Sequence, residues 1–260
     1  MNVVGLIASI LIGFSLGLLG GGGSILTVPV LVYLFFLDPV LATAYSLFIV
    51  GGTSVAGSVS YFKKGKVDLK TVITFGIPSV LAVFLTRRFL VPALPDVIFK
   101  TGQFALTKGL LLLLLFAVLM LVAARSMIKG SHIKENTPEV GIRMLIIQGV
   151  LIGIITALVG AGGGFLIIPV LVNMLHLPMK TAVGTSLAII SINSLLGFLF
   201  SLPTIIVDWQ LLIMITAIAV IGIFLGSFVS TKIDGKKLKP AFGWFVLVMG
   251  LYIIIRELFF

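Results

Sequence analysis

Apolar segments separated by short polar stretches fill almost the whole chain. They lie at about 3–19, 24–37, 40–62, 67–86 and 103–124, and then at 144–159, 164–177, 180–202, 208–230 and 239–255. A membrane-spanning helix needs about 20 apolar residues. The third, fourth and fifth segments of each group reach or approach that length, but the first two do not. The pattern predicts an all-α polytopic membrane protein in which the first two segments of each group form a short or re-entrant hairpin.

Each predicted hairpin is interrupted by a glycine run that leads into a proline-containing apolar stretch. The first run reads GGGGSILTVPVL at 20–31, and the second reads GAGGGFLIIPVL at 160–171, which is 140 positions later. Lipid cannot satisfy the backbone amides that such a run would expose. We therefore expect the glycines to face protein or a water-filled cavity.

The two halves of the chain are related by an internal duplication. With a shift of 140 positions they align without a gap from Ile12 and Ile152 to Leu85 and Leu225. About a third of the aligned positions are identical, so duplication is the simplest interpretation. We divide the chain into a first membrane repeat at 1–125, a basic linker at 126–143 and a second membrane repeat at 144–260.

Basic loops orient the two repeats in opposite senses. In the first repeat, Lys63, Lys64 and Lys66 follow the third segment, whereas the equivalent loop of the second repeat has no Lys or Arg and the basic run comes one segment later, at 232–239. Because basic loops are cytoplasmic, this pattern predicts two inverted-topology repeats of about five helical segments each. The linker is then cytoplasmic and both termini lie outside. Arg87 and Arg88 fall on the outer side in this scheme and disagree with it, but the two larger basic clusters agree with it.

Composition fits the same class of protein. The chain is 60% hydrophobic and 10% charged, with a mean hydropathy of +1.31, whereas soluble domains carry about 25% charged residues. The formal net charge of +10 is explained by cytoplasmic loops in a lipid bilayer, so we expect no nucleic-acid partner. The chain has no cysteine, which excludes disulfides and thiolate metal sites. We expect no metal and no cofactor.

The glycine runs are candidate anion sites. Helices that begin near Gly23 and Gly163 would leave their first N–H groups unpaired and direct their positive ends into the protein. Helix N-termini of this kind bind anions, and two of them entering from opposite faces would meet near the midplane. Pro29 and Pro169, about two turns further on, are expected to break the helices locally. The alternative is that the glycines only permit close helix packing.

The third segment of each repeat is unusually polar and could supply hydroxyl and amide donors to an oxyanion. The alternative role is interhelical hydrogen bonding, which is worth about 0.6 kcal/mol per bond in membranes. The candidate substrate-binding residues are Gly21, Gly22, Gly23, Ser24, Tyr45, Ser46, Ala161, Gly162, Gly163, Gly164, Thr185, Ser186 and Asn193.

Carboxylates are placed at segment ends. No Asp or Glu falls in the middle of a predicted span, which favours an anionic solute over a cation. Asp68 and Asp208 begin the fourth segments and are predicted helix N-caps. Holding an anion with neutral dipoles would avoid burying a fixed Arg or Lys, which is costly when the site is empty.

Three motifs carry a family resemblance: the paired glycine–proline runs, the stretch KTAVGTSL at 180–187 and the turn GKVD at 65–68. With them the chain resembles the TauE/SafE family, also called the sulfite exporter or toluene sulfonate uptake permease family. The resemblance implies movement of a small sulfur-containing anion such as sulfite, sulfoacetate, thiosulfate or an organosulfonate across the prokaryotic inner membrane. Tyr45 stands where the second repeat has Thr185, which makes the expected site asymmetric.

The resulting hypothesis is a secondary transporter that works by alternating access around a midplane anion site. A passive anion channel with the same site is the alternative. An enzyme is disfavoured, because the sequence offers no Cys, no HExxH motif and no carboxylate pair at membrane depth. The particular anion, the direction of flux, a proton or sodium ion as coupling partner, and a homodimer as the oligomeric state are left open by the sequence.

Overall fold

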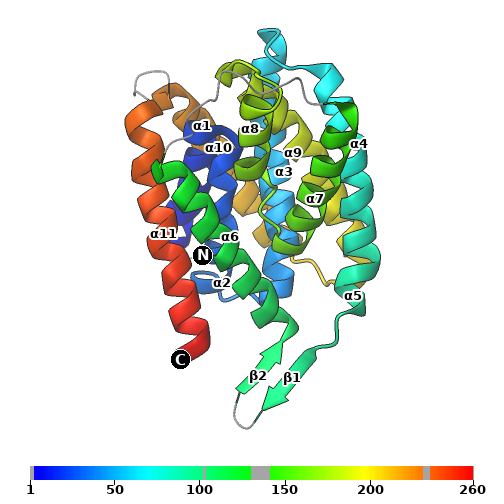
Figure 1. Ribbon diagram of the computed structural model, residues 1–260. Helices are drawn as coiled ribbons and strands as arrows, with labels where there is room; N and C mark the ends of the chain where they lie inside the picture. Colours follow the sequence, from blue (N-terminus) through cyan, green and yellow to red (C-terminus); the bar gives the residue numbers. More distant parts are fainter. Residues whose placement is uncertain (1–2, 102–103, 130–140, 231–234, 260) are drawn as a thin grey trace.

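The structure is a computed structural model that describes residues 3–101, 104–129, 141–230 and 235–259. It is a bundle of helices with one small β-hairpin at its lower end (Figure 1). In chain order the elements are α1 (Val3–Leu19), η1 (Gly20–Leu26), α2 (Thr27–Tyr33), α3 (Pro39–Lys63), α4 (Leu69–Leu85), η2 (Thr86–Leu90), α5 (Val91–Ala93), β1 (Val97–Thr101), β2 (Phe104–Thr107), α6 (Lys108–Lys129), α7 (Ile142–Val159), α8 (Gly164–Asn173), α9 (Met179–Ser201), η3 (Leu202–Thr204), α10 (Trp209–Ser230) and α11 (Gly235–Phe259).

The protein is a multi-pass helical membrane protein. Among the described residues, 8 helices are long and apolar enough to cross a membrane. Helix α2 has 7 residues and α8 has 10; at 1.5 Å per residue even α8 is only about 15 Å long, half of a bilayer core. The predicted short second segments are therefore confirmed as short helices.

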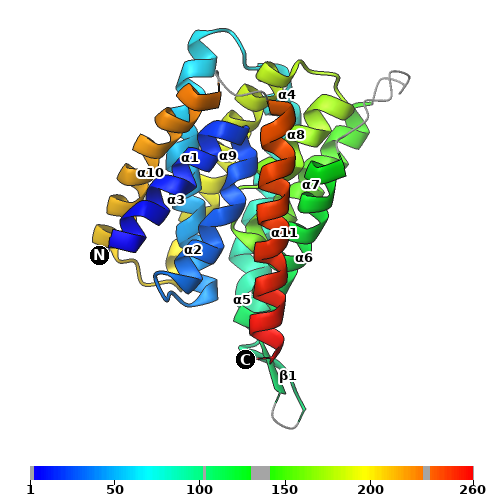
Figure 2. The same ribbon diagram turned by 90° about the vertical axis from the view of Figure 1, so that its left-hand side faces the viewer.

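The two glycine-broken hairpins enter the bundle from opposite ends. We call α1, η1 and α2 the first hairpin, and α7, α8 and the turn between them the second hairpin. The first hairpin opens toward the lower end of the bundle and the second toward the upper end (Figures 1 and 2). The start of α1 and the end of α11 both lie toward the lower end (Figure 2).

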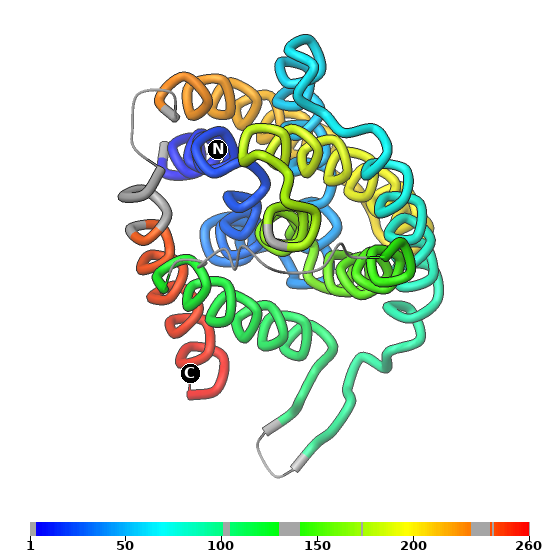
Figure 3. Tube along the Cα trace, turned by 45° about the horizontal axis from the view of Figure 1, so that its top comes forward, coloured from blue at the N-terminus to red at the C-terminus, as the bar shows by residue number. Residues whose placement is uncertain are grey.

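Helix packing pairs elements from the two halves of the chain. Helix α1 packs along α10, α4 packs along α7, and α3 packs along α9. Helices α6 and α11 form a fourth pair, which lies at one side of the bundle when it is viewed from above (Figure 3). This arrangement surrounds the two hairpin turns with helices.

Glycines allow two of these pairs to approach closely. On α1 and α10, a Cβ at Gly13, Gly17, Gly222 or Gly226 would meet the backbone of the facing helix. On α7, a Cβ at Gly149 would lie 2.7 Å from the carbonyl oxygen of Phe75 on α4. Small residues allow this approach, and the van der Waals contact it creates drives helix association in lipid.

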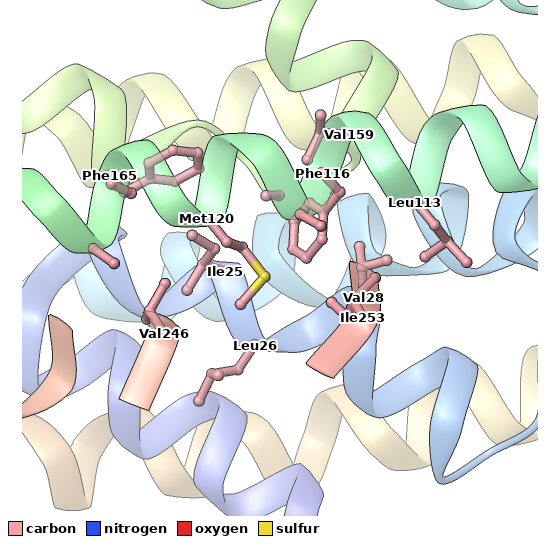
Figure 4. Close-up of a cluster of buried hydrophobic side chains, with 14 residues drawn as sticks. Ile25, Leu26, Val28, Leu113, Phe116, Met120, Val159, Phe165, Val246 and Ile253 are labelled. Carbon is pink, nitrogen blue, oxygen red and sulfur yellow. The ribbon is translucent and has the colours of Figure 1, made fainter. Parts of the chain in front are cut away.

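An apolar cluster joins the pair α6 and α11 to both hairpins (Figure 4). Phe116 and Met120 of α6 lie against Ile25 and Val28 of the first hairpin and against Phe165 of the second. The cluster continues to α11 through Val246 and Ile253. One helix pair therefore covers the apolar sides of both hairpins.

The fifth segment of the first repeat begins later than predicted. The sequence indicated an apolar helix from about 103, but β1 and β2 form an antiparallel hairpin and α6 begins at Lys108. Thr107 explains the boundary, because its Oγ1 accepts a hydrogen bond from the N–H of Leu110, 3.2 Å away, as an N-cap does. The expectation of an all-α chain therefore needs this one correction. Residues 130–140 of the predicted linker lie outside the described residues.

We predict that Gly13→Ala destabilises the protein and that Gly76→Ala does not. The new Cβ at Gly13 would overlap the backbone of Ala219, whereas a Cβ at Gly76 meets nothing within 4 Å. Overpacking of this kind costs about 1–3 kcal/mol, while alanine in a helix gains up to about 1 kcal/mol over glycine. Thermal unfolding of the two purified variants in detergent measures the difference. Equal melting temperatures would show that α1 and α10 are not closely packed.

Candidate functional site

The two glycine turns adopt different conformations. In the second hairpin, Gly160, Gly162 and Gly163 have left-handed φ values of 75°, 67° and 71°, which glycine adopts without steric cost. Helix α8 then begins at Gly164, close to the predicted start. In the first hairpin, Gly20–Leu26 form a 3₁₀ helix that runs directly into α2. The first turn therefore has one left-handed glycine, Gly20 with φ 65°, whereas the second has three.

The two turns touch each other in the middle of the bundle. A Cβ at Gly21 would lie 2.6 Å from the Cα of Gly164, and a Cβ at Gly164 would overlap the backbone of Gly21. Beside them, a Cβ at Gly162 would meet Val50 of α3 and Ile190 of α9, which lie about halfway along those helices. Seen from above, the first and second hairpins lie side by side at the centre (Figure 3). The predicted meeting of the turns is thus present.

Helix α3 anchors the second turn. The Ser46 hydroxyl donates to the carbonyl oxygen of Gly160 at 2.7 Å. One helical turn earlier, Thr43 packs so closely on the same glycine that a Cβ on Gly160 would overlap it. Two hydroxyl-bearing residues of the first repeat therefore fix the position at which α7 ends.

Several buried hydroxyls near the turns have no hydrogen-bond partner. Thr156 Oγ1 is unpaired and faces the position where Gly163 would carry a side chain, and Ser194 Oγ is unpaired beside Gly162. In the first repeat, Thr27 Oγ1 and Ser54 Oγ are also buried and unpaired. Unpaired buried hydroxyls are costly, and among the described residues these atoms are the buried hydroxyls that lack a partner.

Some of the predicted hydroxyl ligands bind the protein itself. Ser24 donates to the carbonyl of Gly21 at 2.9 Å, and Ser186 donates to the carbonyl of Val183 at 2.9 Å. Asn193 donates through Nδ2 to Ser79 Oγ at 2.7 Å, and its Oδ1 is unpaired. The hydroxyl hydrogens of Ser24 and Ser186 are therefore already used in bonds to the protein. Asn193 keeps an unpaired acceptor atom, Oδ1.

Tyr45 and Thr185 form a reciprocal pair of bonds between the repeats. The Tyr45 hydroxyl accepts from the N–H of Asp208 at 2.5 Å, and Thr185 Oγ1 accepts from the N–H of Asp68 at 2.9 Å. Each bond ties the third helix of one repeat to the start of the fourth helix of the other. Both hydroxyls can still donate one hydrogen bond.

Arg87 lies inside the bundle. It belongs to the π-helix η2, its side chain is 2% exposed, and its Nη1 donates to Thr43 Oγ1 at 3.2 Å. Neither its Nε nor its Nη2 has a hydrogen-bond partner among the described residues. The neighbouring Arg88 is exposed. Thr43 contacts both Arg87 and Gly160, so a single residue separates the buried guanidinium from the second turn.

Comparison with known proteins identifies the family. The family model described as "Sulfite exporter TauE/SafE" matches residues 5–253. The chain belongs to the TauE/SafE family. A "Probable membrane transporter protein" of Xylella fastidiosa is 30% identical to this TauE/SafE chain over 99% of the chain and 98% of the relative.

More distant relatives carry the same description. A probable membrane transporter protein of Methanocaldococcus jannaschii is 28% identical over 95% of the TauE/SafE chain and 94% of its own length. One of Bacillus subtilis is 27% identical over 99% and 97%. The comparison with solved structures found no match. Relatives from bacteria and an archaeon are therefore described as transporters along their whole length.

Arg87 corrects the sequence-based view of the TauE/SafE chain. We expected the fourth segment to end at about 86, with Arg87 and Arg88 in an outer loop, but the apolar span continues through Leu69–Ala93. The signal was present in the sequence, because Leu85, Phe89 and Leu90 flank the two arginines. An ionisable residue within a span is a functional-site candidate by default.

The other local expectations have separate outcomes. Asp68 caps α4 by accepting from the N–H of Lys70 at 3.2 Å, and Asp208 accepts from the N–H of Leu211 at 3.0 Å, so both predicted N-caps are confirmed. Helix α2 runs past Pro29 to Tyr33, and α8 runs past Pro169 to Asn173. Neither proline ends its helix. The assignment of the glycines and hydroxyls to an anion stays a prediction.

We predict that Tyr45→Phe and Thr185→Val each lower the melting temperature of the TauE/SafE protein. Each change leaves a backbone N–H without its acceptor, which costs about 1–3 kcal/mol. Ser201→Ala is the matched control, because the Ser201 hydroxyl donates to the carbonyl of Gly197 in its own helix. Unfolding curves in detergent measure the effect. A melting temperature unchanged from the control would show that the inter-repeat bonds contribute nothing.

Proposed function

We propose that this protein is a secondary transporter that moves a small sulfur-containing anion by alternating access. One observation carries the proposal: the glycine turns of two hairpins that enter from opposite ends of the bundle meet at its centre. A guest bound there would lie beside the turns of both hairpins. A shift of either hairpin would then open the site toward one end, as in transporters with a midplane site.

Inverted-topology repeats are part of this proposal. Three features support them: the opposite entry of the hairpins, the equivalence of the α1–α10 and α7–α4 pairs under a shift of 140 positions, and the reciprocal bonds of Tyr45 and Thr185. Each of these three features relates one repeat to the other in a matched way. Such swapped contacts are expected when two copies of one unit pack around a two-fold axis in the membrane plane.

The chemistry of the buried residues favours an anion. Among the residues that the structure describes, the buried polar side chains are those of Ser and Thr, with Asn193 and Arg87. These groups donate hydrogen bonds, and none is a carboxylate that would attract a cation. The first turn of α8 adds unpaired N–H groups and the positive end of a helix dipole.

The family description supports a sulfur oxyanion as the solute. We further propose that the protein lies in the prokaryotic inner membrane with both termini outside, and that a proton or sodium gradient drives the flux. A passive channel would use the same site but could not accumulate the anion. Transport rather than catalysis is the activity that membership of this family favours.

We predict that cysteines placed at positions 64 and 204 are labelled from opposite sides of the membrane. Lys64 and Thr204 are equivalent under the 140-residue shift, and both are exposed. Because the native chain has no cysteine, each single variant reports one loop. A membrane-impermeant maleimide applied to intact cells should label Thr204→Cys, and Lys64→Cys only after the membrane is broken. Labelling of both from the same side would rule out inverted repeats.

We predict that liposomes containing the protein take up labelled sulfite, thiosulfate or sulfoacetate saturably, and that Gly164→Ala abolishes uptake. The new methyl group would push the two turns apart. Gly76→Ala should retain uptake, because its methyl group meets open space. Accumulation above the equilibrium level under an imposed proton or sodium gradient separates a transporter from a channel. Uptake by Gly164→Ala equal to that by Gly76→Ala would remove the turns from the site.

A further inference from the structure

We propose that Arg87 binds the transported anion directly, and that the anion site therefore belongs to the second glycine turn rather than being shared equally by both. This inference rests on the proposed function and adds to it a fixed positive charge. It replaces a site of neutral dipoles by one in which a guanidinium supplies most of the attraction.

The first step is the state of the guanidinium. Arg87 is 2% exposed and lies within the span Leu69–Ala93, yet its only hydrogen bond in the described chain is the one to Thr43. A buried charge without a counter-ion is costly. A binding site that awaits an anion accounts for this arrangement, because the missing partner arrives with the solute.

The second step is which nitrogens are unpaired. Nη1 is occupied by Thr43, whereas Nε and Nη2 have no partner. Those two nitrogens form one edge of the planar guanidinium, from which two parallel N–H bonds can be donated. Two oxygens of one sulfonate, sulfite, carboxylate or phosphate group match this fork. The ligand is therefore an oxyanion with at least two terminal oxygens.

The third step is the placement of the fork. Thr43, which holds Nη1, also packs on Gly160, and the next hydroxyl along α3, Ser46, holds the Gly160 carbonyl. The π-helix η2 packs against both α7 and α9. π-Helical segments of this kind are frequent at functional sites because the wider turn re-aims a side chain. Arg87 is consequently separated by one residue, Thr43, from the turn that leads into α8.

The fourth step is the comparison of the repeats. Under the 140-residue shift, Arg87 corresponds to Ser227 and Thr43 to Val183. At the first turn, a Cβ on Gly20 would meet the methyl groups of Val183 at 2.8 and 3.2 Å. At the first turn the equivalent of Thr43 is thus the apolar Val183, and the equivalent of Arg87 is a serine without a guanidinium. The guanidinium of η2 therefore lies near the second turn and has no equivalent near the first.

The test compares Arg87→Gln with Arg88→Gln. Both remove one positive charge from η2, but Arg88 is exposed. Purified wild-type protein in detergent is titrated with sodium sulfite, thiosulfate, sulfoacetate, sulfate, phosphate and acetate, and the melting temperature is recorded. A bound ligand raises it in a concentration-dependent way. We expect Arg87→Gln to need an anion concentration about 30-fold higher or more for the same rise in melting temperature. Arg88→Gln should need the same concentration as the wild type.

The melting temperature without anion supplies a second readout. Arg87→Gln should melt at or above the wild-type temperature, because it removes an unpaired buried charge. Arg87→Lys should keep the charge but lose the fork, and should bind more weakly than wild type. If Arg87→Gln melts lower and still responds to anions as Arg88→Gln does, Arg87 is structural and the inference is overturned.

The outcomes separate this inference from the proposed function. If sulfur oxyanions stabilise the wild type and both Gln variants equally, the transporter proposal stands and Arg87 is not a ligand. If only phosphate or acetate stabilises the wild type, and Arg87→Gln abolishes that effect, Arg87 is confirmed as a ligand and the sulfur substrate is wrong. If none of the six anions changes the wild-type melting temperature, both proposals fail.

Discussion

The backbone contact between Gly21 and Gly164 is the constraint on which the centre of this protein depends. Two chain turns can touch in the interior of a membrane protein only if neither carries a side chain at the point of contact and if their polar groups are shielded from lipid. The surrounding helices meet the second requirement, since α3 and α9 pass on one side and the α6–α11 pair covers the other. The helices of the bundle therefore surround a contact point that is too close for even a methyl group.

The same constraint determines which local features could be predicted from the sequence. Glycine runs, proline spacing and the Asp68 and Asp208 caps are local signals, and they correctly predicted two short hairpins and the starts of α4 and α10. The duplication could be predicted because the two halves of the amino-acid sequence align with a constant shift of 140 positions. The β-hairpin before α6 was missed, since β1 lies between two predicted segments and the apolar residues of β2 were included in the fifth segment.

The tertiary partners of polar side chains could not be predicted in the same way. Spacing placed Tyr45, Ser46 and Thr185 near the turns, but only the packed structure assigns their oxygens to backbone groups of the opposite repeat. Arg87 was placed on the outer side of the membrane because the fourth segment was predicted to end at about 86. In the structure the helical span continues through η2, where Arg87 lies inside the bundle and Arg88 is exposed.

The bonds of Tyr45 and Thr185 have a consequence for how the protein can move. They join α3 to α10 and α9 to α4, and the close packing of α1 on α10 and of α7 on α4 extends the two groups. Each group of three helices takes members from both halves of the sequence, and the 140-residue shift converts one group into the other. If the proposed alternating access moves these two groups against each other, their boundary is the α3–α9 interface, and that boundary crosses both repeats instead of coinciding with the linker.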